Sequence, residues 1–131
     1  MKELFKAGDF KVHVFLVKED HLASFEDGPV HPVCSTFVLA REMEWSSRLF
    51  VLDICDANEE GVGTMLLINH KSPAFMGEEV VVKAVFRSLV NNELVCDIEV
   101  SVEDRLVAIG ETGQKILSKE KISQIFTSLE R

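Results

Sequence analysis

The chain has 131 residues, 47% of them hydrophobic, which is enough for one domain with a core and short for two. Its formal net charge of -8 argues against nucleic-acid binding, which depends on clustered Lys and Arg side chains. No apolar run is long enough for a membrane span or a secretion signal, and three cysteines without C-x-x-C spacing favour a reducing compartment, so we expect a cytoplasmic protein.

The first predicted element is a strand over residues 10–16. Apolar side chains stand at every second position from Phe10 to Leu16 and alternate with Lys11 and His13, which is the period of a half-buried strand. Residues 19–33 follow and contain two prolines, which restrict the backbone. This segment is predicted to be an irregular loop with at most a short helical turn, and it could form a lid.

Residues 35–54 are predicted to form one long helix. They contain no Gly or Pro, are rich in good helix formers, and begin with Ser35 or Thr36 as a cap. The apolar residues cover much of the circumference, as expected of a central helix that a sheet wraps around. These residues are Phe37, Leu39, Ala40, Met43, Leu49, Phe50 and Leu52.

Antiparallel strands are predicted for most of the chain between the turn at residues 56–61 and residue 117. Asn91 and Asn92 favour a tight hairpin turn because Asn tolerates a positive φ. A second turn is predicted at residues 103–105. The predicted strands are 63–70, 79–86, 93–102 and 106–117.

The tail, residues 119–131, is predicted to end in a short helix because its apolar residues have helical spacing. The order of elements is therefore one strand, one long helix and four strands. This is an α+β arrangement in which a helix lies on an antiparallel sheet of about five strands, and it is the order of a hotdog fold.

Three side chains could take part in chemistry. Glu44, between Met43 and Trp45, would lose water and could act as a base if it turns toward the sheet, although a solvated helix glutamate is the alternative. Thr36 could attack a carbonyl or position a water if a base is adjacent, or it could simply cap the helix. His70 ends an apolar strand and could carry protons near pH 7, or it could be a surface histidine.

Gly63 is the fourth candidate, because a glycine that opens a strand lets a ligand approach the backbone closely. Its N–H could then stabilise an oxyanion, although an ordinary turn glycine is the alternative. The remaining histidines have no metal-ligand spacing, so we predict no metal site. They are His13, His21 and His31.

Taken together, these residues resemble the pattern of the fluoroacetyl-CoA thioesterase-like family of hotdog proteins. The resemblance covers residues 10–116 and leaves the tail outside. Family members often carry a histidine after the Ile-Gly pair of the last strand, where this chain has Gln114. The matching stretches are Val33-Cys34-Ser35-Thr36, Met43-Glu44-Trp45, Gly61-Val62-Gly63-Thr64 with His70, and Ile109-Gly110.

The resemblance implies one hotdog domain over residues 1–131 that works as a homodimer. It implies hydrolysis of a short or small acyl-CoA thioester to free acid and CoA, with no separate cofactor. Thr36, Glu44 and His70 would converge on the thioester carbonyl in a cleft at the dimer interface. Glu44 would be the base or the direct nucleophile, Thr36 its hydroxyl partner and His70 the proton shuttle, with either Glu44 or Thr36 as the attacking group. The N–H of Gly63 would then point at the carbonyl oxygen. Three basic residues near the site strand are candidates for binding the CoA phosphates: Lys71, Lys83 and Arg87.

Other functions remain open on the sequence alone. A non-catalytic module that binds or senses acyl-CoA would keep the fold and lack turnover. Hydration of an enoyl thioester is less favoured, because the chain lacks the close Asp and His spacing of the hotdog enzymes that carry it out. A structural role without chemistry is the remaining alternative.

Overall fold

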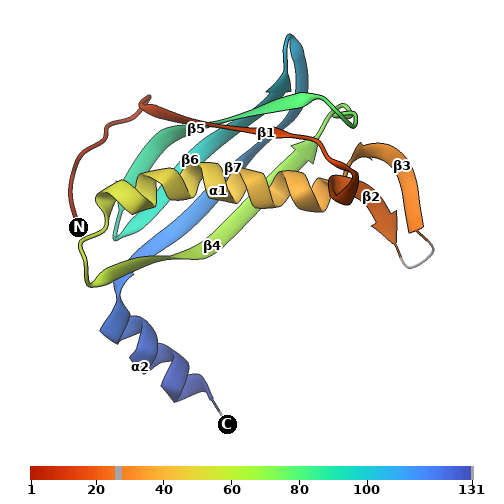
Figure 1. The fold of residues 1–131 in the computed structure, drawn as a ribbon. Coiled ribbons are helices and arrows are strands. Elements are labelled where there is room, and N and C mark those ends of the chain that lie inside the picture. The colour runs from red at the N-terminus through yellow and green to blue at the C-terminus, as the bar shows by residue number, and fades with distance from the viewer. Residues whose placement is uncertain (26–27, 131) are drawn as a thin grey trace.

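The computed structural model describes residues 1–25 and 28–130. Its main body is an antiparallel five-stranded sheet in the order β1-β5-β6-β7-β4, with the long helix α1 lying across one face (Figure 1). Alternate residues of the central strands β5 and β6 point toward α1 and are buried, which gives the core. The bounds are α1 (Thr36–Ile54), β1 (Phe10–Leu16), β4 (Glu59–His70), β5 (Glu79–Val90), β6 (Glu93–Val102) and β7 (Arg105–Ser118).

The predicted long helix is confirmed, and Ser35 is its N-cap. The Ser35 hydroxyl accepts a hydrogen bond from the N–H of Val38 at 3.1 Å. The side of α1 that faces the sheet is fully buried, with Leu39, Met43 and Phe50 at 0% exposure. The opposite side remains exposed in the single chain: Phe37, Trp45 and Leu52 lie there.

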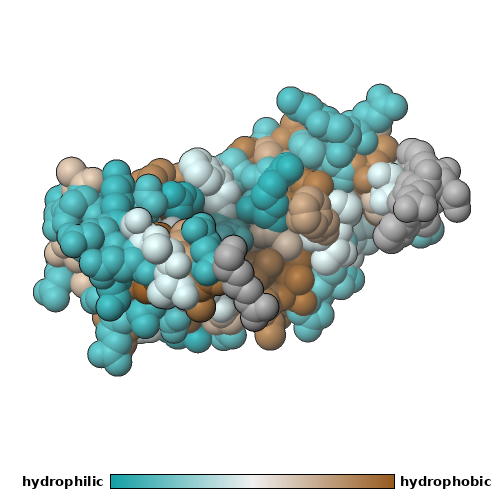
Figure 2. All heavy atoms as spheres, turned by 90° about the horizontal axis from the view of Figure 1, so that it is seen from below, coloured by the Kyte–Doolittle hydropathy of each residue, from teal (hydrophilic) through white to brown (hydrophobic). Residues whose placement is uncertain are grey.

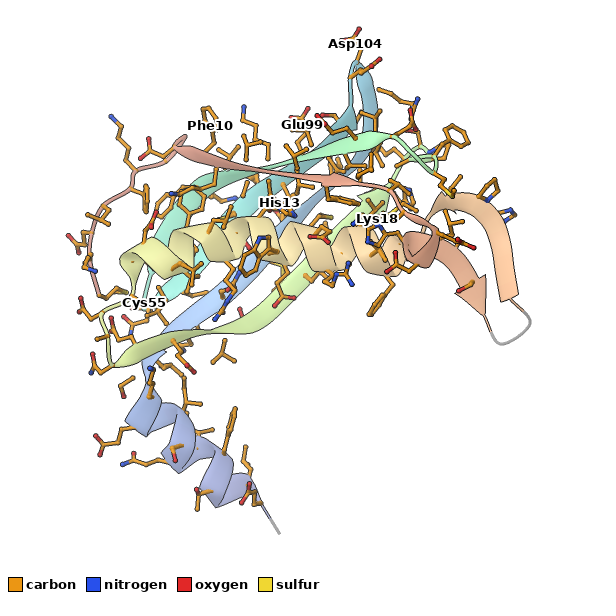
Figure 3. The ribbon with its side chains drawn as sticks, viewed as in Figure 1. Phe10, His13, Lys18, Cys55, Glu99 and Asp104 are labelled. Carbon is orange, nitrogen blue, oxygen red and sulfur yellow. The ribbon has the colours of Figure 1, made fainter. Side chains whose placement is uncertain are left out.

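Strand β1 has the predicted bounds, but its polar residues face α1 and the apolar residues at its even positions face outward, which was not expected. Phe10 is 58% exposed and points away from α1, whereas His13 points toward it (Figure 3). The polar residues face the helix because they find partners there: Lys11 pairs with Asp53, and His13 Nε2 lies 2.8 Å from a carboxylate oxygen of Glu42. The apolar side of β1 is consequently left on the outer face of the sheet.

The prediction of an irregular loop over residues 19–33 is wrong. The segment forms a short 3-10 helix, η1 (Glu19–His21), and a two-stranded ribbon of β2 (Leu22–Phe25) and β3 (Gly28–Cys34). The register of the ribbon shifts twice, and such an irregular ribbon tolerates prolines that a regular central strand would not. Residues 26–27 lie outside the described part of the chain.

The remaining elements follow the prediction with longer strands. Strand β4 begins four residues earlier than predicted, at Glu59, and β5 continues to Val90. Asn91 and Asn92 have φ of 51° and 65°, which confirms the tight hairpin. The tail forms α2 (Lys119–Leu129). No helix in the described part of the chain is both long and apolar enough to cross a membrane.

Candidate active site

Thr36 and His70 meet where α1 begins and β4 ends. Thr36 Oγ1 lies 2.9 Å from His70 Nδ1, which is hydrogen-bond distance. Because Ser35 caps the helix, the Thr36 hydroxyl is not needed as the cap and can bond the imidazole instead. The alternative in which Thr36 is merely a helix cap is therefore wrong, and the structure brings two of the three candidate reactive side chains together.

Glu44 lies two helical turns further along α1 and contacts Gly63 of β4. A Cβ atom at Gly63 would come within 2.9 Å of Glu44 Oε1, so the absence of a side chain there leaves room for the carboxylate. Glu44 is exposed in the single chain. The neighbouring Glu42 is the more enclosed glutamate, at 14% side-chain exposure beside His13. In a single chain Glu44 therefore keeps its contact with water, contrary to the expectation for a glutamate acting as a base.

A bulge in β4 allows both Gly63 and His70 to face α1. The two residues are seven positions apart, and in a regular strand they would point to opposite faces. Gly63 pairs with Gln114 and Met65 pairs with Gly113, which leaves Thr64 as an extra residue in β4. The bulge therefore shifts the alternation by one position and puts the two candidate site residues on the same face.

The two contacts lie at separate points within one chain. Thr36 and Glu44 are eight helical residues apart, about 12 Å along the axis of α1. Gly63 and His70 are separated by roughly 20 Å along β4. The structure consequently forms a Thr36–His70 pair and a Glu44–Gly63 pair, and the Glu44 carboxylate does not reach the imidazole inside a single subunit.

Gln114 of β7 joins the sheet to the turn of α1 that carries Glu44. It is 2% exposed, and its Nε2 donates to Ser47 Oγ at 2.8 Å and to the backbone oxygen of Glu44 at 3.3 Å. In the sequence this residue was notable only as a departure from the family pattern. Its position opposite Gly63 depends on strand pairing, so spacing along the chain gave no signal for this role.

A hollow of about 440 Å³ opens beside the start of α1. It lies between the first turns of the helix and the segment formed by η1 and β2, and its lining includes Leu22, Thr36, Phe37 and Arg41. Thr36 thus borders a space that a small group could enter, whereas His70 is not part of its lining. The segment considered as a possible lid lines one side of that space.

The three basic candidates for the CoA phosphates lie in different places. Lys71 directly follows His70. Lys83 and Arg87 stand on the face of the sheet that points away from α1, where Lys83 Nζ lies 4.5 Å from the centre of the Phe10 ring. Arg87 bonds two carboxylates there, which raise the pKa of its guanidinium. The structure therefore brings only Lys71 near the Thr36–His70 pair.

The two carboxylates that hold Arg87 are those of Asp97 and Glu111.

Cys34, two residues before Thr36, is buried, and burial raises the pKa of its thiol to about 11. It therefore stays protonated near neutral pH and is a poor nucleophile. Within residues 1–25 and 28–130, no three His, Cys, Asp or Glu side chains gather as a metal site.

Comparison with known proteins gives a family and several structural relatives. The family model of the fluoroacetyl-CoA-specific thioesterase matches residues 17–120. A hypothetical protein of Thermus thermophilus, a thioesterase superfamily member, is 30% identical with a TM-score of 0.91, over 98% of this chain and 95% of its own. None of the curated proteins matches the sequence significantly.

Two further structures support the fold. A mutant of the fluoroacetyl-CoA-specific thioesterase is 19% identical with a TM-score of 0.87, over 98% of this chain and all (100%) of its own. A hot-dog-like protein of Thermanaerovibrio acidaminovorans is 15% identical with a TM-score of 0.86, over 97% and 95% of the two chains. The hotdog fold predicted from the order of elements is thereby confirmed. Since the family model spans most of the sequence, the chain belongs to the fluoroacetyl-CoA-specific thioesterase family.

Proposed function

We propose that this protein is an acyl-CoA thioesterase that hydrolyses a short or small acyl-CoA to free acid and CoA. The observation that carries the proposal is the hydrogen bond between Thr36 and His70 beside a hollow, in a chain of a thioesterase family. A hydroxyl is a weak nucleophile unless a base lies next to it, and here the imidazole supplies that base.

The reaction needs placement and proton transfer more than it needs a metal, because a thioester is already an activated acyl group. An oxygen nucleophile adds to the carbonyl carbon while His70 or Glu44 takes its proton. The C–S bond then breaks, and the proton passes to the departing thiolate of CoA. If Thr36 attacks, water subsequently hydrolyses the ester on its hydroxyl. If water attacks directly, the acid forms in one step. No separate cofactor is required by either route.

The Gly63 backbone N–H is the proposed donor to the oxyanion that forms in this step. Lys71, beside His70, is the proposed contact for a CoA phosphate, and Arg41 is a second candidate because it lines the hollow next to Thr36. These are local cations in a chain of net charge -8, so binding would depend on short-range contacts rather than long-range attraction.

We further propose that the working form is a homodimer joined through β4. Within the described residues β4 pairs with β7 alone and forms one edge of the sheet. An exposed apolar edge strand is a site for pairing with another chain. Figure 2 views the molecule from this side and shows hydrophobic residues exposed near the middle of it. The exposed large apolar residues of β4 are Met65, Leu66 and Leu67, at 40%, 42% and 53%.

The position of the bulge in β4 determines which residues of two paired β4 strands would lie opposite each other, and that alignment would complete the site. Two copies of β4 can pair in antiparallel fashion with Leu67 on the twofold axis. The bulge at Gly63 and Thr64 would then lie opposite His70 of the partner subunit, because Thr64 and His70 are each three residues from the axis. Opposite residues in such a pair are about 5 Å apart at Cα. Glu44 would thereby approach the partner subunit's Thr36 and His70.

The proposal also includes a cytoplasmic location, consistent with three free cysteines in the chain, two of them buried.

Release of free thiol from a panel of acyl-CoAs tests the activity. Glu44→Ala and His70→Ala are expected to lower turnover by about 10²–10⁴-fold, which is the usual contribution of a general base. Glu60→Ala, at an exposed position of the same strand, is the control and should turn over normally. Equal turnover in wild type and both site variants would remove the proposed roles. Tight binding of acyl-CoA with no thiol release would instead support a binding or sensing module.

A further inference from the structure

The C-terminal helix α2 has an apolar stripe that its own subunit covers only in part. Ile122, Ile125, Phe126 and Leu129 follow the spacing of one helix face. In the described chain no residue of α2 is buried, and Phe126 and Leu129 are 56% and 73% exposed. An isolated helix of 11 residues is marginal in water, so its stability depends on packing against another surface.

The position of α2 indicates where that surface is. The N–H of Lys119 donates to the backbone oxygen of Asn58 at 2.7 Å, and Ser118 pairs with Glu59, the first residue of β4. Figure 1 shows α2 leaving the sheet at this end and extending past the β4 edge, away from the rest of the subunit. It therefore enters the space that a second copy paired along β4 would occupy.

The proposed register brings an exposed apolar surface of the partner to that place. With Leu67 on the twofold axis, the first residues of β4 extend past His70 of the partner subunit, where the partner's β4 ends, and so lie beside the segment that follows it. In that segment Phe75 and Met76 are 45% and 55% exposed in each chain. Phe75 forms a bridge with Val33, which places it close to the start of α1 in the same subunit.

Phe37 adds to the same surface, since it is in the first turn of α1 and is 76% exposed. We infer that α2 of each subunit packs on the partner subunit, with its apolar stripe against the partner's Phe37, Phe75 and Met76. This inference rests on the proposed homodimer. Each helix would then cover the end of the partner that carries the Thr36–His70 pair, and the C-terminal tail would form one wall of the entrance to that site.

The contact cannot form inside one subunit. Asn58 and Phe75 lie beyond opposite ends of β4, whose 12 residues span roughly 40 Å. Helix α2 is about 16 Å long and starts at the Asn58 end. A disulfide between a residue of the α2 stripe and a residue near Met76 can therefore form only between two chains. Cross-linking is for this reason a direct test.

The test uses the pair Phe126→Cys and Met76→Cys in a Cys55→Ser background, because the other two native cysteines are buried. Mild oxidation is expected to give a covalent dimer on a non-reducing gel. The matched control replaces Phe126→Cys with Ser123→Cys, an exposed residue outside the apolar stripe, and should give much less cross-linking. If the oxidised Phe126→Cys pair stays uncross-linked in a solution that light scattering shows to be dimeric, the inference is overturned.

A second variant keeps the test independent of cysteine chemistry. Phe126→Asp should raise the dissociation constant of the dimer at least tenfold and raise KM, while Thr127→Asp on the neighbouring exposed position should leave both near the wild-type values. Because Phe126 is exposed in its own subunit, the fold should tolerate the change. A Phe126→Asp protein that dimerises and binds as wild type overturns the inference while leaving the thioesterase proposal intact. If the wild-type protein hydrolyses no acyl-CoA while the variant with Phe126→Cys and Met76→Cys gives the cross-link, only the proposed activity is overturned.

Discussion

The space beside Gly63 is occupied by the Glu44 carboxylate, so a single methyl group there tests the role of Glu44. Gly63→Ala would place a Cβ 2.9 Å from Glu44 Oε1. Since that oxygen ends a flexible side chain, it can move away, and the free energy of unfolding should change by less than about 1 kcal/mol. Thiol release, however, should fall by about tenfold or more because the base is displaced. Turnover and thermal unfolding measured on the same sample check both parts.

Gly110→Ala is the contrasting variant for this prediction. Its Cβ would meet the backbone oxygen of Leu67 at 2.0 Å, and a strand backbone cannot move aside as a side chain can. The main effect of Gly110→Ala should therefore be a loss of folding stability. A Gly63→Ala enzyme with wild-type turnover would mean that the position of Glu44 does not matter for the reaction.

The Thr36 hydroxyl can be tested through its bond to His70. Thr36→Ser keeps the hydroxyl and should retain most of the activity, whereas Thr36→Val keeps the shape, loses the hydroxyl and should lose about 10²-fold or more. Steady-state kcat for the two variants is the measurement. Intact mass during turnover adds a second result, because an acyl group on the protein identifies Thr36 as the attacking group. Equal kcat for Ser and Val would exclude a role for the hydroxyl.

Sequence reasoning located the Thr36–His70 pair through family resemblance, and the structure supplied the physical reason for it. Ser35 takes the capping bond and so releases the hydroxyl next to it. The parts that could not be predicted depend on strand pairing. The extra residue at Thr64 and the place of Gln114 opposite Gly63 become visible only once β4 and β7 are aligned.

At the scale of elements, the segment between β4 and β5 is held in place by one charged side chain, Glu78. The Glu78 carboxylate accepts the N–H of Phe75 at 2.7 Å and pairs with Arg105, and these contacts lower its pKa. A lowered pKa in the folded state gives stability above the ordinary glutamate value of about 4.3. That stability is lost as the pH falls through the lowered pKa of the folded protein.

Glu78→Gln should consequently destabilise the protein at pH 7 and make less difference as the solution becomes strongly acidic. Urea unfolding midpoints of both proteins at several pH values between about 3 and 7 provide the measurement. Glu79→Gln, at the exposed next residue, controls for the loss of a negative charge. A gap between Glu78→Gln and wild type that is constant at every pH would show that the carboxylate contributes no pH-dependent stability.

The elements themselves were largely predictable, but the direction in which they face was not. The period of β1 identified a strand correctly. Which side turned inward was decided by the partners that Lys11 and His13 found on α1, and a single strand carries no information about those partners. The ribbon of β2 and β3 was missed because prolines usually mark loops, whereas a two-stranded ribbon with an irregular register accommodates them.

For the whole molecule, the edge of β4 decides whether the chain can dimerise as proposed. Leu67→Lys would place two like charges directly opposite each other at the twofold axis, which opposes pairing. In a single subunit the new lysine would lie near Asp97 and Glu111, so the fold should tolerate it. The dissociation constant should rise at least tenfold, and activity should follow the fraction of dimer. Val90→Lys, at an exposed position on β5, is the control. Sedimentation at several concentrations distinguishes the outcomes.

Mixed dimers test whether the site is shared between two subunits. Glu44→Ala and His70→Ala chains should each be inactive alone. In a mixed dimer, one site would combine the intact His70 of one chain with the intact Glu44 of the other, while the second site would lack both groups. Random exchange makes half of the dimers mixed, so an equimolar mixture should recover about a quarter of wild-type activity if the twofold arrangement is correct. The measurement is thiol release before and after the subunits are unfolded together and refolded. A mixture that stays inactive would place all the reacting groups within one chain, which the separation of Glu44 from His70 argues against.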